Sequence, residues 1–444
     1  MSPHVDIGRW NRRLAALASE FEVPGASLAI SYQDGATFSC TTGVLNRSTG
    51  APVTADSLFQ IGSITKVWTT TQLMLLVEQG RLALDTPVVS VLPEFRVWDA
   101  QATRAVTVRH LLTHSSGIDG DLFTDTGRGD DCLQKYVGAC AGLGQLFAPG
   151  DGQSYCNAGF VIAGRIVEHM TGLSWDEALR KQIIEPLGLT HTCTLPEEAL
   201  RFATALGHGD DGAPVGVWGL PRAIGPAGLV CARASDVVAF GRAHLTPGAL
   251  LADPQALRTA QVDVPNPHVD AQQWGLGWGL TTWDGQQVAF HGGDTIGQHA
   301  MLWVLPSTGT VVALLTNGGR TFNFQHALAG ELFKELAHVT APSPLAPPGR
   351  PASVDPARFA GVYERAGSRI TATVVEDALR LRTEPTGALE GLAPSREFTL
   401  TAVDDHTFLG RHDDASLWDS VVFETKPDGT SYLHYSGRAT PRVR

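Results

Sequence analysis

The sequence predicts an α+β fold in which an antiparallel sheet, flanked by helices and interrupted by a helical insertion, is followed by a small antiparallel β-barrel. Three features predict it. Strand-like segments occur in residues 23–44 and again in 274–317, whereas helical spacing prevails from about residue 100 to 240. Residues 354–444 consist of short segments in which apolar and polar residues alternate, as in half-buried strands.

The first elements are a helix, a pair of strands and a second helix. Residues 1–21 are amphipathic, and residues 23–44 have the pattern of two strands. From Ser63 to Glu78 the apolar residues are spaced for one helical face, and Gly80 follows as a suitable C-terminal stop. We therefore expect a largely buried helix that begins near Ser63.

The later elements are strands, a helix and a strand-rich module. In the first sheet, four more strands are expected at 274–283, 287–293, 299–306 and 309–317. A helix with the sequence QHALAGELFKELAH follows them. Six short strands of the module are expected at 359–365, 368–376, 378–384, 396–403, 420–426 and 431–437. The prolines of TAPSPLAPPGRPASVDP favour an extended spacer, so we predict domains at 1–338 and 354–444 and a linker at 339–353.

Composition and charge exclude several classes of function. The chain has 444 residues, 43% of them hydrophobic, which is enough for more than one core. Its 33 basic and 45 acidic residues give a net charge of −12 without a basic run, so we expect no nucleic acid and no membrane as partners. No stretch has the roughly 18 apolar residues of a membrane span. Since the N-terminus also lacks a signal-peptide pattern, we expect a cytoplasmic protein.

The cysteines and histidines form no metal-binding pattern. Six cysteines are scattered without a CxxC pair, and in a reducing compartment most should be buried thiols. Cys132 and Cys140 are close enough in sequence for a disulfide, which the sequence alone leaves open. His110 and His114 have HxxxH spacing but lack the glutamate that a zinc hydrolase uses as its base. We expect no metal and no cofactor.

The first group of chemically active residues is Gly62-Ser63-Ile64-Thr65-Lys66, at the start of the second predicted helix. Side chains three residues apart share one helical face, so the Lys66 amine can approach the Ser63 hydroxyl. A lysine whose pKa is lowered by burial can take the serine proton, and the helix N-terminus offers amides to an oxyanion. An isolated SxxK is more often an N-cap serine with an exposed lysine, so other motifs must decide.

Two further motifs accompany it. In Tyr155-Cys156-Asn157, side chains two apart in an extended loop would point the same way, giving a phenol for proton transfer and an amide for a substrate carbonyl. In VAFHGGD, His291 lies on a predicted strand and can donate a hydrogen bond, and the glycines let a substrate backbone lie close to the strand. Each motif is weak by itself, and their combination carries the interpretation.

In this order and at these separations, SITK, YCN and HGG resemble the three active-site motifs of the serine β-lactamase and penicillin-binding-protein superfamily. The resemblance covers about residues 5–338 and includes VPGASLAI, FQIGSITK, LLTHSSGI and GLVCARASDV, which are typical of its class C-like branch. It implies a β-lactamase-like α/β sandwich with a helical subdomain. The strand-rich module is similar to the lipocalin-like domain of some members.

The resemblance also implies a role for each matching residue. Ser63 corresponds to the acylated nucleophile, Lys66 to its general base and Tyr155 to a proton carrier. Asn157 corresponds to a ligand of the substrate amide. The oxyanion hole would consist of the backbone amides of Ser63 and Asp294.

The third motif departs from the commonest form of the family. His291 stands where the usual KTG has its lysine, and Gly293 matches the glycine of that motif. Histidine is usual at this position in the esterase, D-peptidase and cyclase branches. True β-lactamase or transpeptidase activity is therefore less expected.

Three longer strings, GIDGDLFTDTGRGDDCLQKYVGAC, WGLPRAIGPAGLV and HYSGRATPRV, are similar to surugamide-type cyclases, the penicillin-binding-protein-type thioesterases. This implies a stand-alone thioesterase that takes a nonribosomal peptidyl thioester from a carrier protein onto Ser63 and releases it by head-to-tail macrolactam cyclisation. Arg438 would then reach a substrate carboxylate or carbonyl, although it can equally be a solvated terminal arginine. The alternative is a D-stereospecific esterase, an aminopeptidase or a β-lactamase-like hydrolase with the same acyl-serine chemistry.

Overall fold

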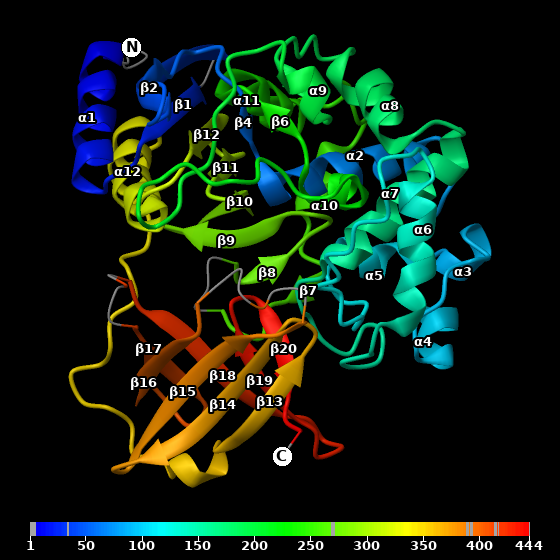
Figure 1. Ribbon diagram of the computed structural model, residues 1–444, viewed down its shortest axis with the longest axis vertical. Helices are drawn as coiled ribbons and strands as arrows, with labels where there is room; N and C mark the ends of the chain where they lie inside the picture. Colours follow the sequence, from blue (N-terminus) through cyan, green and yellow to red (C-terminus); the bar gives the residue numbers. More distant parts are fainter. Residues whose placement is uncertain are drawn as a thin grey trace.

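The computed structural model describes residues 6–32, 35–267, 271–387, 390, 394–412, 415 and 417–443. Among these residues, the larger part is built on an antiparallel sheet of nine strands in the order β3-β2-β1-β12-β11-β10-β9-β8-β7 (Figure 1). The strands are β1 (Gly25–Tyr32), β2 (Ala36–Asn46), β3 (Ala51–Pro52), β7 (Val262–Asp263), β8 (Gln273–Trp274), β9 (Gly279–Trp283), β10 (Gln286–Asp294), β11 (His299–Leu305) and β12 (Thr310–Thr316). The strands expected in both parts of the sequence are present, and the one expected at 274–283 is divided into β8 and β9.

Both faces of this sheet are covered, so its central strands β1 and β12 are buried along their whole length. Alternate residues of β12 enter two separate cores, since Val311 faces one and Val312 the other. The helices α1 (Ile7–Glu20) and α12 (Thr321–Leu336) pack side by side over one face (Figure 1). The N-terminal and closing helices predicted from the sequence therefore form one layer.

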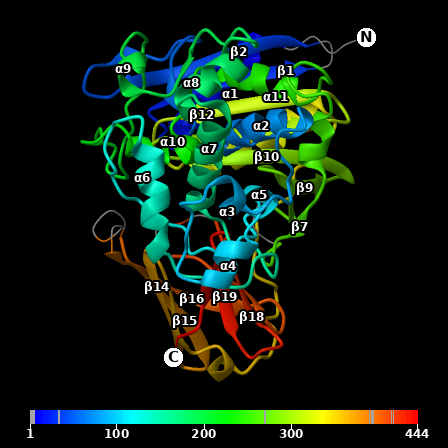
Figure 2. The ribbon, with the colours of Figure 1, turned by 90° about the vertical axis from the view of Figure 1, so that its right-hand side faces the viewer.

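Helices of the middle region cover the other face and extend beside the sheet as a helical subdomain (Figure 2). Its central helix, α2 (Thr65–Glu78), is buried on almost every side. A small sheet of β4 (Phe59–Gln60), β6 (Cys231–Ala232) and β5 (Thr192–Cys193) leads the chain into that helix. The other helices are α3 (Val88–Val91), α4 (Ala100–Ala105), α5 (Val108–Leu112), α6 (Cys132–Ala139), α7 (Asn157–Thr171), α8 (Trp175–Leu179), α9 (Pro196–Ala199), α10 (Gly225–Gly228) and α11 (Ala234–Ala243).

The C-terminal part is an eight-stranded antiparallel meander, counted over the residues described there. Its strands are β13 (Gly361–Arg365), β14 (Ser368–Val375), β15 (Ala378–Pro385), β16 (Arg396–Ala402), β17 (Thr407–Gly410), β18 (Asp419–Thr425), β19 (Ser431–Tyr435) and β20 (Arg438–Pro441). A bridge between Tyr363 and Arg442 brings the first and last strands together, so the barrel is nearly closed. The sequence predicted six of these strands and missed β17 and β20, whose four residues each are too few to show an alternating pattern.

The barrel lies below the larger part and contacts it along the side that carries β7 and β8 (Figures 1 and 2). Asn266 connects the two parts, because its Nδ2 donates to the carbonyl of Ser420 at 3.0 Å and the Ser420 hydroxyl donates to its Oδ1 at 2.6 Å. Residues 340–355, between the two parts, contain neither helix nor strand. The side chains buried inside the barrel are mostly aromatic and aliphatic.

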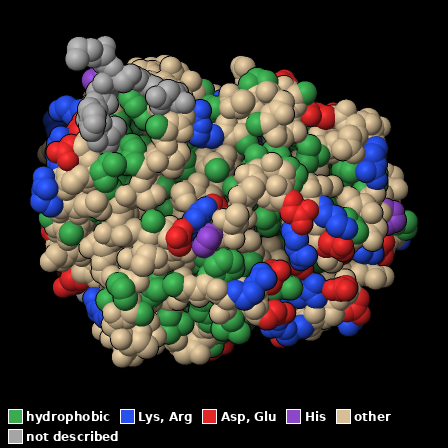
Figure 3. Space-filling model, turned by 90° about the horizontal axis from the view of Figure 1, so that it is seen from above, with side chains coloured by type: hydrophobic (Ala, Val, Ile, Leu, Met, Phe, Trp, Pro, Cys, Tyr) green, Lys and Arg blue, Asp and Glu red, His purple; other side chains and the backbone are tan. Residues whose placement is uncertain are grey.

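All six cysteines are free and buried, so Cys132 and Cys140 are not bridged. Over the part of the chain that the structure describes, no helix is both long and apolar enough to span a bilayer. Acidic and basic side chains are interspersed on the face shown in Figure 3, and neither sign forms a continuous patch there.

Candidate active site

Ser63 lies in a short 3-10 turn, Gly62–Ile64, that leads from β4 directly into α2. Near the start of that helix, the Lys66 Nζ lies 2.9 Å from Ser63 Oγ. The same amine donates to the backbone carbonyl of Ala227 at 2.7 Å. Ser63 is partly exposed, whereas Lys66 is fully buried. The nucleophile is therefore reachable from solvent, and its base is shielded.

The environment of Lys66 suits it to accept a proton. Burial lowers the pKa of its amine well below the ordinary value, and the nearby Arg438 guanidinium lowers it further. Acidic groups around the site oppose this shift without reversing it. An amine that is neutral near neutral pH can remove the proton of the Ser63 hydroxyl.

Tyr155 lies beside the Ser63–Lys66 pair, with the centroid of its ring 4.9 Å from the Lys66 Nζ. Burial raises the pKa of its phenol above the ordinary value, although a hydrogen bond with Ser63 opposes the rise. The ring stacks on His114 at a centroid distance of 4.2 Å. Tyr155 therefore stays protonated and lies within reach of the reacting oxygen, as a proton carrier requires.

Asn157 is the first residue of α7 and does not belong to an extended loop. The loop ends one residue earlier, at Cys156, whose Sγ caps the helix by accepting from the Gly159 amide at 3.3 Å. The expectation that Tyr155 and Asn157 share a strand-like face is therefore wrong. Asn157 nevertheless lies close by, and its Nδ2 donates to Asp121 Oδ1 at 2.8 Å. Its second amide hydrogen and its carbonyl oxygen can still bind a substrate amide.

His291 lies on β10, and its ring is 6.3 Å from the Tyr155 ring. Its Nδ1 donates to the carbonyl of Gly292 at 2.5 Å, which leaves Nε2 as an acceptor. Burial lowers the pKa of the imidazole to about 3, and the nearby Lys66 contributes to the shift. The ring is therefore neutral, and its only N–H is used within the protein. A substrate group that meets Nε2 must be a hydrogen-bond donor, whereas the sequence had suggested a donating histidine.

The backbone of β10 lies against the turn that carries Ser63. A Cβ atom built on Gly293 would lie 1.9 Å from the Ile61 carbonyl oxygen and 2.9 Å from the Ser63 amide nitrogen. One built on Gly62 would lie 2.6 Å from the Asp294 amide nitrogen. Only glycine permits this approach, which brings the amides of Ser63 and Asp294 to the same place. The pair is therefore suited to form an oxyanion hole.

We predict that Gly293→Ala disrupts this arrangement. The added methyl group would collide with backbone atoms that cannot rotate away, so the two amides must separate. Losing one oxyanion donor lowers the rate of acyl transfer by at least about 100-fold. Gly292→Ala is the matched control, because its Cβ would lie 3.5 Å from Met301 Cε, an ordinary contact. Rates of aryl-ester hydrolysis for the two variants test this, and equal rates would show that the close approach is unimportant.

A buried ion-pair cluster connects the barrel to this site. Asp121, whose side chain is 4% exposed, accepts from Arg438 Nε at 2.6 Å and Nη2 at 3.2 Å, and from Arg365 Nη1 at 2.7 Å. Burial opposes ionisation of Asp121, but the two guanidinium groups outweigh it and lower the pKa to about 2. The Arg438 guanidinium carbon lies 5.2 Å from the Tyr155 ring centroid. Arg438 is therefore a paired residue at the active site and not a solvated terminal arginine.

The structure thus gathers Ser63, Lys66, Tyr155, Asn157, His291, Gly293, Asp294 and Arg438 around one centre. It adds Asp121, His114 and Trp274, which sequence reasoning did not place in the site. Trp274 lies edge-on to His291 at 5.6 Å and to Tyr155 at 6.1 Å. For Asp121 the only signal in the sequence is its place in the GIDGD string.

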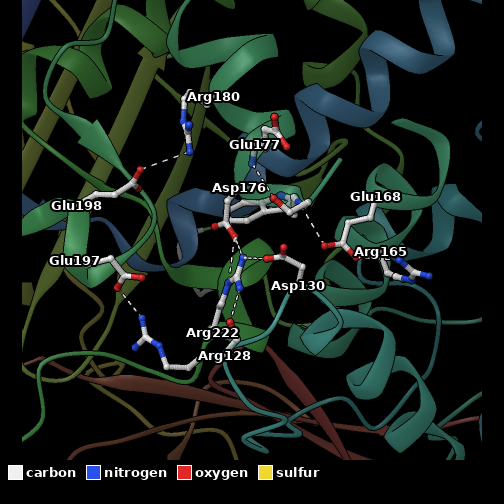
Figure 4. Close-up of polar contacts among 12 residues, drawn as sticks. Arg128, Asp130, Arg165, Glu168, Asp176, Glu177, Arg180, Glu197, Glu198 and Arg222 are labelled. Carbon is white, nitrogen blue, oxygen red and sulfur yellow. Dashed lines mark hydrogen bonds and ion pairs between the residues drawn. The ribbon is translucent and has the colours of Figure 1, made fainter. Parts of the chain in front are cut away.

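A second group of charges lies elsewhere, around α8. Arg222 donates to Asp176 and to Asp130, both at 2.9 Å, and Glu168 accepts from Arg165 at 3.1 Å (Figure 4). These contacts join α8 to the segments around residues 128–130 and 222. The nucleophile Ser63 is not a member of this network, which we interpret as structural.

Comparison with known proteins gives consistent matches. The family model described as Beta-lactamase matches residues 10–333. Penicillin-binding protein 4 of Amycolatopsis lactamdurans is 47% identical over 376 residues, which are 82% of this chain and 98% of that protein.

Two solved structures differ in how much of the chain they match. A crystal structure of SurE with D-Leu has a TM-score of 0.78 and 26% identity, and the match covers 98% of this chain and 100% of that one. D-amino acid amidase from Ochrobactrum anthropi SV3, complexed with L-phenylalanine amide, has a TM-score of 0.60 and 26% identity over 71% of this chain and 92% of that one. The first match therefore includes the barrel.

Proposed function

The chain belongs to the beta-lactamase family of serine hydrolases, and from this membership we propose that it is a thioesterase that cyclises a peptide. In this proposal a nonribosomal peptidyl thioester acylates Ser63 and leaves as a head-to-tail macrolactam. The observation that carries the acyl transfer is the contact of 2.9 Å between Ser63 Oγ and the buried amine of Lys66, whose pKa burial lowers well below the ordinary value.

The first half-reaction forms an acyl-enzyme. Ser63 Oγ attacks the thioester carbonyl while Lys66 removes its proton, and the oxyanion is bound by the amides of Ser63 and Asp294. The C–S bond then breaks, and the sulfur leaves as a thiol after it receives a proton through Tyr155. The carrier thiol is the first product, and the peptide is held as an ester of Ser63.

The second half-reaction releases the peptide. Its own N-terminal amine attacks the ester carbonyl, and Lys66 removes a proton from the nitrogen, either directly or through the Tyr155 hydroxyl. The C–O bond breaks, Ser63 Oγ regains a proton, and an amide closes the ring. Water would give the linear acid instead, so cyclisation requires a shielded site. The barrel, which supplies Arg438 beside Tyr155, is well placed to form part of that wall.

Several observations favour cyclisation over the alternatives. The match to SurE extends over the barrel, whereas the match to D-amino acid amidase covers 71% of the chain. His291 offers a neutral acceptor where most β-lactamases and transpeptidases have a lysine, so the site has no cation there for a substrate carboxylate. A D-stereospecific esterase or amidase is the second candidate, supported by the amidase match. We expect a carrier protein as the partner, and the cytoplasm as the compartment in which carrier-bound thioesters are made.

The test is mass spectrometry of the products formed from a small-molecule thioester of a peptide that has a free N-terminal amine and a D-residue at its C-terminus. We expect a cyclic product one water lighter than the linear acid, with a transient acyl adduct on the protein. The matched control is the same peptide with an acetylated N-terminus, which can give only the linear acid. Linear acid from both peptides would support the D-specific esterase, and the absence of both adduct and turnover would contradict acyl transfer.

A further inference from the structure

We propose that Asp121 is the positioning residue through which the barrel organises the acyl-transfer centre. Asp121 does not contact the reacting atoms, and it acts through Asn157 and Arg438. This role presupposes the acyl-transfer function proposed above and adds to it a reason why the barrel is part of the catalytic unit. Asp121 does not belong to the SITK, YCN or HGG motif.

One carboxylate holds groups from three distant parts of the chain. Oδ1 accepts from Asn157 Nδ2 at 2.8 Å and from Arg438 Nη2 at 3.2 Å. Oδ2 accepts from Arg438 Nε at 2.6 Å and from Arg365 Nη1 at 2.7 Å. A carboxylate has about four lone-pair positions, and all of them are used here. Asp121 therefore fixes its partners in direction as well as in distance.

Asn157 and Arg438, through which Asp121 acts, both lie next to the catalytic Tyr155. Asn157 follows the Tyr155 loop directly, and Arg438 lies over the Tyr155 ring with its guanidinium carbon 5.2 Å from the centroid. The barrel residues on either side of Arg438 also bind this loop, since the Tyr155 amide donates to the Gly437 carbonyl at 2.9 Å and the Ala439 amide donates to Ser154 Oγ at 3.1 Å. If Arg438 loses its bidentate partner, the wall behind Tyr155 loosens.

Arg365 and Arg438 share the Asp121 carboxylate, and Asp119 is a second acidic group that interacts electrostatically with both guanidinium groups. Arg438 has five N–H groups, and the structure uses one on Nε, one on Nη2 for Asp121 and one on Nη1 for the Ser436 carbonyl. Its side chain is 22% exposed, so the remaining donors can meet a substrate carbonyl. Asp121 thus sets the direction of those donors while reducing their charge.

The chain offers a control two residues away. Asp119 Oδ2 accepts from the backbone amide of Ala366 in the barrel at 2.6 Å. Like Asp121, it connects the larger part of the molecule to the segment that contains Arg365. Among the described residues Asp119 makes no hydrogen bond or ion pair with Asn157 or Arg438, although it lies close enough to Arg365 and Arg438 to interact with them electrostatically. Asp119→Asn therefore removes a barrel contact and a nearby acidic group while it leaves the hydrogen bonds of Asn157 and Arg438 to Asp121 in place.

The experiment compares Asp121→Asn with Asp119→Asn in the full chain. The release of nitrophenol in the first turnover of a nitrophenyl ester measures Ser63 acylation, whatever the later fate of the acyl group. We expect Asp121→Asn to slow acylation at least about 30-fold and Asp119→Asn less than about threefold. Acylation by Asp121→Asn within threefold of the control would overturn the positioning role. No release by the unmodified protein would overturn the proposed function and this inference together.

The pH profile of acylation separates positioning from general destabilisation. The titratable and charged groups that face Lys66 are Arg438, Asp121, Cys156, Asp294, Tyr155, His114 and His291. The Asp121 carboxylate favours the protonated amine, so its removal lowers the pKa of Lys66 further. Because the base must be neutral, the acid limb of the profile should move to lower pH in Asp121→Asn and stay in place in Asp119→Asn. An unmoved limb would contradict the proposal.

Asp121→Asn leaves two buried guanidinium groups without the carboxylate that binds them, and the variant can therefore fail to fold. The double variant Asp121→Asn/Arg365→Gln removes one of these charges and is used in that case. We expect it to have a higher thermal midpoint than the single variant, with acylation still slowed at least about 30-fold. If the double variant acylates as fast as the unmodified protein, the carboxylate stabilises the fold and has no positioning role.

Discussion

Ser63→Ala is expected to abolish acyl transfer, with both cyclisation and hydrolysis reduced at least about 10³-fold. The hydroxyl oxygen lies next to the buried Lys66 amine, and the structure places no second hydroxyl in hydrogen-bond contact with that amine among the described residues. Without it the thioester has no covalent acceptor on the protein. The measurement is the intact mass of the protein during turnover, together with the yield of cyclic and linear peptide.

Ser90→Ala is the matched control for this change. Ser90 is exposed, and its hydroxyl donates to the nearby Pro87 carbonyl, so the variant should keep full activity and form the acyl adduct. Turnover by Ser63→Ala at more than about a tenth of the normal rate would refute the acyl-serine mechanism for both the cyclase and the esterase.

Lys66→Met should reduce acyl transfer about as much as Ser63→Ala does, and it should also raise the thermal stability of the protein. Methionine fills much of the same space but cannot take a proton, so acylation should fall about 10³-fold or more. At the same time a fully buried amine is replaced by an apolar side chain, which removes an unfavourable desolvation. The thermal midpoint should therefore rise. Calorimetry and ester hydrolysis measure the two effects.

The difference in thermal midpoint between Lys66→Met and the unmodified protein should depend on pH, and the direction of this dependence can be predicted. Burial lowers the pKa of Lys66 in the folded state, so the unfolded chain binds the proton more tightly. Between the lowered folded pKa and the ordinary value, a fall in pH favours unfolding of the native sequence but not of Lys66→Met. The gain in thermal midpoint should thus increase as the pH is lowered from about 10 through this range.

The matched control for this change is Lys181→Met, at an exposed lysine whose one ion pair among the described residues is with Glu177 on the same stretch of helix. It should change neither the rate nor the midpoint by much, because an exposed ion pair contributes little. A fall in the midpoint of Lys66→Met at neutral pH would mean that the amine is held charged by its neighbours and is not the base.

The strands and helices that carry the nucleophile were predictable because their signals are local. Apolar runs mark β10 to β12, and apolar residues at helical spacing mark the helix expected from Ser63 to Glu78, which the structure has as the 3-10 turn Gly62–Ile64 followed by α2. Strands β17 and β20 were missed, since four residues do not establish a period. The start of α7 at Asn157 was also missed, because a cysteine is an uncommon N-cap and its Sγ gives no recognisable capping signal.

Whether His291 offers a hydrogen-bond donor or an acceptor to a substrate is an example of what a motif leaves open. The string HGG puts an imidazole on β10, but the tautomer depends on which ring nitrogen finds a partner. The contact with the Gly292 carbonyl depends on the local rotamer and on burial by Tyr155 and Trp274, which come from separate segments. Only the folded molecule shows that the histidine presents an acceptor.

By itself, the sequence determined the reacting pair. Lys66 follows Ser63 by three residues, and side chains at this spacing share one face of any helical segment, wherever that segment lies in the fold. The tertiary structure decided what surrounds the pair. Arg438 is 317 residues from Asp121, and no local rule relates them. Their ion pair exists because the barrel packs against the loop of Tyr155, and packing of this kind depends on the shapes and charges of whole surfaces, which short sequence patterns do not encode.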